Sequence, residues 1–269
     1  MNKCEPELIK KEFMDIYYCV CTLTRDEILN GSDDSFSSCF EKLQCLLAED
    51  VDDRTAEIML GDSKFCMAVK HLAVLKRING LKMEITYAKS IITAHDAWKQ
   101  IQRFPYYQNY INLARMEYKG ANLKPKDRVI FLGSGPVPMS LICLYRQYGI
   151  SGIGVEKVKE YADLSAQVID ALGLSRHIQI IKGDHFSIPI EKKLSLIMVG
   201  ADARPKNEIF AHLAKKFPKG TKVSYRIYEK GLRRLIDDQS DTAIPFEFKE
   251  YARIRPNPPV NNTSIFLIK

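Results

Sequence analysis

The feature of this sequence that most constrains its fold is a glycine turn between a β-branched run and a helical pattern. Residues 128–132 read Arg-Val-Ile-Phe-Leu, and the turn that follows is Gly133-Ser134-Gly135. Residues 137–148 then place apolar side chains at helical spacing. Glycine permits a tight turn and a close approach to a ligand, and the helix behind it offers N–H groups that have no partner within the helix. The pattern predicts the first strand, loop and helix of a ligand-binding α/β sheet.

Acidic residues stand at the ends of the next two predicted strands. Glu156 can accept hydrogen bonds from both hydroxyls of a ribose, and Asp184 can take an adenine amino group. Pro138 replaces the third glycine of the NAD fingerprint, and the loop lacks the lysine of a P-loop. The remaining candidate is the form of this fold that binds S-adenosylmethionine (SAM). The expected cofactor-binding residues are Gly133, Ser134, Gly135, Pro136, Glu156, Asp184 and Ala201.

Strands and helices alternate in the second half of the chain. The predicted strands are 128–132, 151–155, 177–182, 194–199 and 221–227, and a last antiparallel hairpin is expected at about 247–254 and 263–268. The predicted helices between them are 137–148, 157–172, 206–216 and 229–237. We therefore predict an α/β fold in which a SAM-dependent-methyltransferase-like Rossmann domain occupies residues 124–269.

Residues up to about 126 lack strand patterning. Helices are expected at about 7–23, 35–47, 55–60, 64–93, 96–102 and 106–119. The first of them places Ile9, Phe13, Ile16 and Val20 along one side. An all-helical N-terminal domain is accordingly predicted for residues 1–123, ahead of the Rossmann domain.

Composition limits the classes of partner. The 269 residues carry 40 Lys and Arg against 33 Asp and Glu, a net charge of +7, and the excess is spread without basic–aromatic interleaving. We expect no nucleic-acid partner. The seven cysteines show no metal-ligand spacing, which indicates reduced thiols, a cytoplasmic location and no metal requirement. No stretch is apolar over a length that spans a bilayer, so no membrane association is expected.

Four segments together resemble the nicotianamine synthases, most closely the compact archaeal and bacterial members that include the opine-metallophore synthases. They are Gly133-Ser-Gly-Pro-Val-Pro138, Phe104-Pro-Tyr-Tyr-Gln-Asn-Tyr110, Ser224-Tyr-Arg-Ile-Tyr228 and Val260-Asn-Asn-Thr-Ser264. The resemblance runs from about residue 64 to residue 269, while the first 60 residues match only in being helical. It implies transfer of the 3-amino-3-carboxypropyl (aminobutyrate) group of SAM to an amine, with release of 5′-methylthioadenosine, in metallophore biosynthesis.

The same resemblance assigns catalytic roles to Glu84 and Tyr110, which stand where the family has a glutamate and a tyrosine that handle the nucleophilic amine. The helical neighbours of Glu84 are small or apolar, which should raise its pKa toward that of a useful base. A pairing of Glu84 with Arg77 or Lys82 on an exposed face is the structural alternative. For Tyr110 the alternative is an aromatic core stripe.

Substrate-binding roles are expected for polar groups near the ends of the later strands. Arg226 could hold a carboxylate bidentately, and a surface ion pair is its alternative role. The amide and hydroxyl groups near residue 262 could bind substrate or form a turn. The expected substrate-binding residues are Tyr107, Arg226, Asn261, Asn262 and Ser264. Asp202, after the fourth strand, could touch either ligand.

The predicted activity is therefore an aminocarboxypropyl transfer to a small amino acid or to an intermediate. A SAM-dependent methyltransferase acting on a small molecule or RNA is the first alternative, and a SAM-binding module without activity is the second. The expected partners are the amino-acid substrate and SAM, in a monomer or a homodimer. The residues do not identify the acceptor or the number of groups added.

Overall fold

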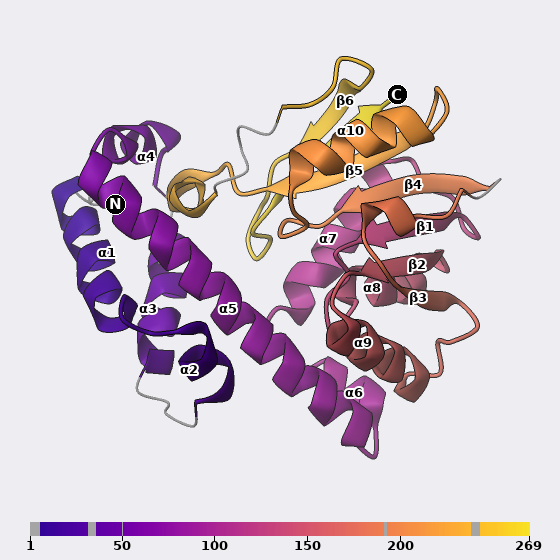
Figure 1. Ribbon diagram of the computed structural model, residues 1–269, viewed down its shortest axis with the longest axis horizontal. Coiled ribbons are helices and arrows are strands. Elements are labelled where there is room, and N and C mark those ends of the chain that lie inside the picture. The colour runs from indigo at the N-terminus through magenta and orange to yellow at the C-terminus, as the bar shows by residue number, and fades with distance from the viewer. Residues whose placement is uncertain (1–5, 32–35, 50, 191–192, 238–242) are drawn as a thin grey trace. The chain divides into compact units, whose positions relative to one another are not determined.

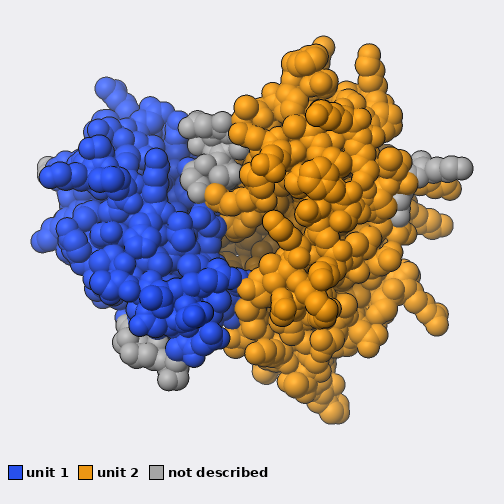
Figure 2. Space-filling model, viewed as in Figure 1, with its two compact units in different colours: residues 1–83, 228–240 blue, residues 84–227, 241–269 orange. Residues whose placement is uncertain are grey.

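A computed structural model describes residues 6–31, 36–49, 51–190, 193–237 and 243–269. The chain divides into two compact units (Figure 2). Unit 1 comprises residues 1–83 and 228–240, and unit 2 comprises residues 84–227 and 241–269. Helix α5 (Ser63–Thr93) contributes its first part to unit 1 and its last part to unit 2. The predicted domain boundary at residues 123/124 stays a prediction.

Unit 1 is built from helices around an apolar core (Figure 1). Its helices are α1 (Pro6–Val20), α2 (Arg25–Asn30), α3 (Ser37–Leu47), α4 (Asp53–Leu60) and the start of α5. The four α1 residues predicted to share one side are all buried. Helix α2 was not predicted, but Thr24 and Glu27 form a capping box that satisfies the backbone at its start. Ser35, the first residue of the helix predicted at 35–47, lies outside the described residues.

A short segment from the second half of the chain completes the core of unit 1. The predicted α-helix at 229–237 is instead a 3₁₀-helix, η3 (Gly231–Ile236). Its side chains Leu232, Leu235 and Ile236 are buried in the same cluster as those of α1, α3 and α4. Asp53 accepts a hydrogen bond from the Gly231 backbone N–H at 3.0 Å. The prediction was wrong because the alternation of strands and helices suggested one more covering helix of the sheet.

Unit 2 holds a seven-stranded sheet. Its strands are β1 (Arg128–Leu132), β2 (Ser151–Glu156), β3 (Ile178–Lys182), β4 (Leu194–Val199), β5 (Lys222–Ile227), β6 (Lys249–Ile254) and β7 (Thr263–Ile268). The order is β3-β2-β1-β4-β5-β7-β6, with parallel pairing from β3 to β5. Strand β7 lies antiparallel between β5 and the edge strand β6. The α/β fold class and the antiparallel hairpin at the edge are confirmed.

Helices cover the sheet and complete unit 2 (Figure 1). After α6 (Ala97–Ile101), α7 (Tyr107–Gly120) packs against α8 (Met139–Tyr148). Helix α9 (Lys159–Ala171) lies on β2 and β3. Helix α10 (Lys206–Lys216) packs with Ile130, Ile153 and Ile197 in one apolar cluster. The 3₁₀-helix η2 (His185–Ser187) follows β3. Among the described residues, none of the helices combines the length and apolar character that crossing a bilayer requires.

Candidate functional site

The glycine loop lies between β1 and α8, as the sequence predicts. Gly133 and Gly135 have φ angles of 76° and 69°, in the left-handed region that favours glycine. A Cβ atom on Gly133 would lie 3.1 Å from the Ala203 Cβ. On Gly135 it would lie 2.7 Å from Glu84 Oε2. The loop therefore requires glycine both for its backbone conformation and for the close approach of a carboxylate.

Glu156 ends β2 and points back at the same loop. Its Oε2 accepts a hydrogen bond from the Gly135 N–H at 3.0 Å, and its Oε1 accepts one from the Val158 N–H at 3.0 Å. The side chain is buried. Both carboxylate oxygens are thus held by backbone donors, which fixes the side chain at the carboxyl edge of the sheet, where ligands of open α/β folds bind.

Glu84, on α5, is a second acid that the structure places against the glycine loop. The side chain is partly buried, and two helical neighbours on its predicted apolar face, Ala88 and Ile91, are fully buried. Burial, with smaller contributions from the Asp202 and Glu156 carboxylates, raises the pKa of Glu84 to about 8. Perturbed acids of this kind concentrate at functional sites. Asp202, which the sequence only weakly indicated, therefore contributes to the same electrostatic environment.

Two further residues predicted to bind the cofactor lie in turns that follow strands. Asp184 precedes η2, and its Oδ1 accepts a hydrogen bond from the Phe186 N–H at 2.9 Å, so it caps that short helix. Ala201 follows β4, and its carbonyl accepts a hydrogen bond from Nζ of the buried Lys206. Both residues lie beyond the carboxyl ends of parallel strands, on the side of the glycine loop.

The predicted tyrosines lie at the start of α7. The Tyr107 hydroxyl accepts a hydrogen bond from Arg146 Nη1 at 3.0 Å, which turns it toward α8. Burial raises the pKa of the Tyr107 hydroxyl, and the charge of Arg146 partly offsets this. The Tyr110 ring packs beside Phe104, with ring centroids 6.2 Å apart. The catalytic role of Tyr110 and the substrate-binding role of Tyr107 stay predictions.

Arg226 makes an ion pair, but a buried one. Its Nε donates to Glu117 Oε1 at 3.1 Å, and its Nη1 donates to Ser140 Oγ at 2.9 Å. Ser264 donates to the same Glu117 oxygen at 3.3 Å. Glu117 was not predicted from the sequence. Its position in the first half of the chain gave no signal that it pairs with an arginine 109 residues later.

The two asparagines of the last loop lie next to this network in the sequence. The Asn261 backbone N–H donates to Asn109 Oδ1 at 3.0 Å, which ties the loop to α7. Asn262 is 6% exposed, and its Nδ2 has no hydrogen-bond partner among the described residues. A buried amide without a partner is costly, so this group is available to a polar ligand. The substrate-binding roles of both residues stay predictions.

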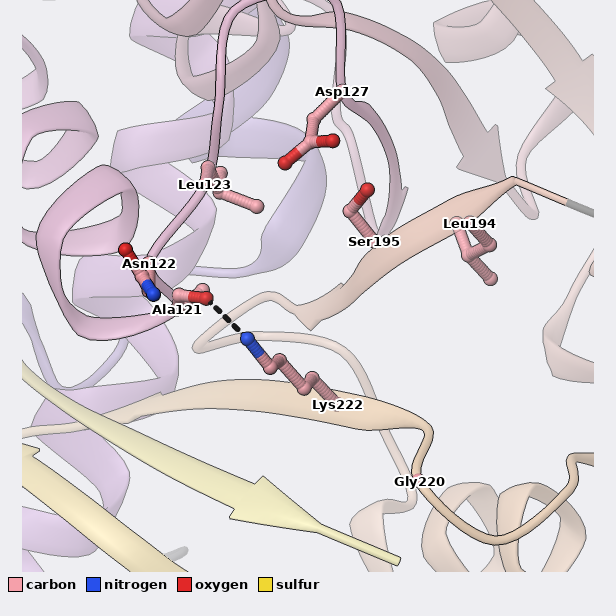
Figure 3. A pocket seen from close by; sticks show the side chains of 8 residues that line it. All are labelled: Ala121, Asn122, Leu123, Asp127, Leu194, Ser195, Gly220 and Lys222. Atoms are coloured by element: carbon pink, nitrogen blue, oxygen red, sulfur yellow. Dashed lines mark hydrogen bonds between the residues drawn. The ribbon is translucent and has the colours of Figure 1, made fainter.

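A separate cavity of about 280 Å³ lies at the other edge of the sheet (Figure 3). It is lined by residues at the amino ends of β1, β4 and β5, including Asp127, Leu194 and Lys222. Its two charged side chains have protein partners, since Lys222 Nζ donates to the Ala121 carbonyl and Asp127 accepts from the Lys124 N–H. None of the predicted site residues lines it. In the described part of the chain, no group of three or more acidic, histidine or cysteine side chains could hold a metal ion.

Comparison with known proteins supports one family. The family model described as nicotianamine synthase protein matches residues 2–269. Nicotianamine synthase 1 of Hordeum vulgare is 28% identical over 160 residues, which cover 54% of this chain and 48% of that protein. Nicotianamine synthase 2 of Oryza sativa subsp. indica is 37% identical over 67 residues, or 23% of this chain and 20% of that protein. The chain spans less than half the length of these curated relatives.

Solved structures agree on the fold. A glutamate-to-glutamine variant of MtNAS in complex with SAM has a TM-score of 0.78 at 23% identity, covering 97% of each chain. MtNAS in complex with MTA and tNA has a TM-score of 0.77 at 23% identity, covering 98% of this chain and 96% of that one. The match of the family model over almost the whole length, with this shared fold, confirms the family prediction: the chain belongs to the nicotianamine synthase family.

Proposed function

We propose that this protein transfers the 3-amino-3-carboxypropyl group of SAM to the amine of an amino acid or of an intermediate, and releases 5′-methylthioadenosine. The observation that carries the proposal is the position of Glu84. Its carboxylate lies against the glycine loop, and its pKa is raised to about 8. A methyltransferase of this fold needs no such base unless its own acceptor must lose a proton, whereas an ammonium group must lose one before it can attack.

The residues around the glycine loop fit SAM. The backbone at Gly133 and Gly135 can come close to a ligand, and Glu156 is fixed where it can meet ribose hydroxyls. The Ser134 hydroxyl is buried and has no hydrogen-bond partner among the described residues, so it is available to a polar ligand. Pro136, Asp184 and Ala201 complete the proposed binding set.

The chain's own groups would then prepare the acceptor. SAM supplies an electrophilic carbon chain on a sulfonium whose thioether leaves. Glu84, in its deprotonated form, accepts a proton from the acceptor's ammonium group at one carboxylate oxygen, and the amine becomes a nucleophile. A base whose pKa is near 8 is well matched to an ammonium group, which holds its proton at neutral pH. Tyr110 orients the amine.

The acceptor is proposed to be a small amino acid, bound by Tyr107, Arg226, Asn261, Asn262 and Ser264. Three of these contribute buried polar groups to unit 2. Buried polar groups that a ligand completes discriminate strongly against compounds that lack the matching group. A metallophore product, a cytoplasmic location and a monomeric or homodimeric state belong to the same proposal.

The test is to incubate the protein with SAM and a mixture of amino acids, and to analyse the products by mass spectrometry. Appearance of 5′-methylthioadenosine with an acceptor heavier by one aminocarboxypropyl group supports the proposal. S-adenosylhomocysteine with a methylated product would instead establish a methyltransferase.

Glu84→Gln keeps the size and removes the base. We expect this variant to bind SAM and to lose transfer. Glu160→Gln, at an exposed position at the start of α9, makes the same change of charge in the same unit and is expected to keep both properties. Full transfer by Glu84→Gln would remove Glu84 from the chemistry.

A further inference from the structure

The strongest remaining feature is the buried network around Arg226 in unit 2. Arg226 is 5% exposed and Glu117 is fully buried. The guanidinium donates one hydrogen bond from Nε to Glu117 and one from Nη1 to Ser140. The Ser264 hydroxyl donates a further hydrogen bond to Glu117. The four side chains come from α7, α8, β5 and β7, so they connect four elements of one unit.

Several contacts fix the orientation of Arg226. Arg226 and Ser264 are directly paired across β5 and β7, so their side chains share one face of the sheet. The Phe131 ring of β1 lies 5.5 Å from the guanidinium carbon. Glu117 holds the Nε edge at 3.1 Å. With these contacts in place, the guanidinium has little freedom to rotate, and Glu117 decides which of its edges is occupied.

The network is incompletely satisfied. Arg226 Nη2 and Glu117 Oε2 are both buried and have no hydrogen-bond partner among the described residues. Two buried charges with unmatched hydrogen-bonding groups stabilise a fold less well than an apolar pair of similar volume. The arrangement is therefore poorly explained by stability alone. It presents one unpaired nitrogen of an arginine close to the carboxyl end of β5, the edge where such sheets bind ligands.

We propose that Glu117 is a positioning residue that occupies the Nε edge of Arg226 and leaves Nη2 to bind the α-carboxylate of an amino-acid group. Its negative charge also offsets that of Arg226 and limits the strength of this contact. The inference rests on the proposed function for the ligand class. The α-carboxylate belongs to the acceptor amino acid or to SAM itself, and the experiment separates these sources.

The test compares ligands that differ only in the carboxylate, by titration calorimetry. One pair is SAM and its decarboxylated analogue, and the other is L-glutamate and its α-amide with 5′-methylthioadenosine present. The pair whose carboxylate meets Arg226 should show a ratio of dissociation constants of about ten or more in the unaltered protein. Glu117→Gln keeps an acceptor for Nε but removes the opposing charge, so this ratio should rise about fivefold.

A double variant and a control complete the design. Glu117→Leu with Arg226→Met removes both charges together, which such pairs tolerate, and should reduce the ratio to about one. Ser151→Ala, at the amino end of β2 and so at the opposite edge of the sheet from Arg226, should leave the ratio unchanged. Ratios within twofold of the unaltered protein in Glu117→Gln, or a ratio retained by the double variant, would overturn the proposal. If Glu117→Gln does not fold, the double variant decides.

Binding and turnover separate this inference from the proposed function. If the protein shows the expected ratios of dissociation constants but forms no 5′-methylthioadenosine, the role of Glu117 is supported and the proposed reaction is contradicted. If the protein forms 5′-methylthioadenosine but shows ratios near one for both ligand pairs, the proposed reaction is supported and the role of Glu117 is contradicted.

Discussion

The Glu156 carboxylate accepts a hydrogen bond from the backbone N–H of Gly135, 21 residues earlier in the chain, at 3.0 Å. This contact ties the end of β2 to the loop that follows β1. The two strands are parallel neighbours, with Leu132 opposite Val155, so the loop and the acid emerge at the same edge of the sheet. A second hydrogen bond, from Val158, holds the other carboxylate oxygen.

Replacing Glu156 by alanine should weaken SAM binding by about tenfold or more, because the side chain holds the glycine loop and is proposed to offer acceptors to the ribose. Titration calorimetry measures the dissociation constant. Glu160→Ala, with an exposed side chain four residues later at the start of α9, is the control. Equal affinity in the two variants would remove Glu156 from the cofactor site.

Gly135→Ala should impair activity and stability more than the same change at Gly149. Both residues have positive φ angles, 69° and 66°, so both variants carry a backbone strain of about 1–2 kcal/mol. Only at Gly135 does the new Cβ meet another group, Glu84 Oε2 at 2.7 Å, whereas nothing lies within 4 Å of it at Gly149. Urea unfolding measures the loss of stability that the backbone strain causes. Transfer assays measure the loss of activity that a displaced Glu84 would cause. If both variants lose activity equally, close approach at Gly135 is not the reason for its glycine.

The rate of transfer should rise with pH and level off above about 8, because the deprotonated form of Glu84 is the proposed base and its pKa is raised to about 8. A pH profile of the transfer rate with saturating ligands tests this expectation. A rate independent of pH between 6 and 9 would contradict the assignment.

The raised pKa of Glu84 also predicts how the stability of the protein depends on pH. The folded protein holds a proton on Glu84 that the unfolded chain, with an ordinary pKa near 4.5, has released. The free energy of unfolding should therefore fall as the pH rises from the ordinary pKa to about 8. Glu84→Gln should lose this part of the slope, as measured by urea unfolding at several pH values. An unchanged slope would show that Glu84 has an ordinary pKa.

Leu232→Ala should destabilise unit 1 by about 2–5 kcal/mol, because the side chain is fully buried among side chains of the helical core. Chemical denaturation followed by circular dichroism measures the loss. Phe246→Ala removes a larger side chain that is 90% exposed, so its effect should stay within about 0.5 kcal/mol. A small effect at Leu232 would place η3 outside this core.

The sequence predicted the features whose cause is local. The glycine loop follows from the backbone demands of a strand–turn–helix unit, and the buried side of α1 follows from helical periodicity. Features that depend on distant partners were missed. The apolar residues of η3 suggested one more helix covering the sheet, yet their partners are buried side chains of α1, α3, α4 and α5. On α5, residues 65, 69 and 72 form a buried side, whereas Met67 is 68% exposed.

The residues of the candidate site also fall into those with a local sequence signal and those whose environment depends on distant partners. Glu84, Gly135 and Glu156 belong to recognisable patterns, and the structure brings them together. Glu117 lies on a helix with other charged residues, and nothing in its neighbourhood distinguishes a buried acid from a solvated one. Its burial follows from the pairing of β5 with β7 and from the position of α7 against β7 and β6, which only the assembled sheet determines.

The return of η3 to the helical core of unit 1 bears on how the protein is made. A ribosome releases α1 to α4 long before Leu232, Leu235 and Ile236, and strands β1 to β5 emerge in between. Part of the apolar surface of these helices therefore stays exposed until most of the strands of the sheet have been synthesised. Unit 1 cannot finish folding during translation ahead of unit 2, although helices α1 to α4 precede every strand of the sheet in the sequence.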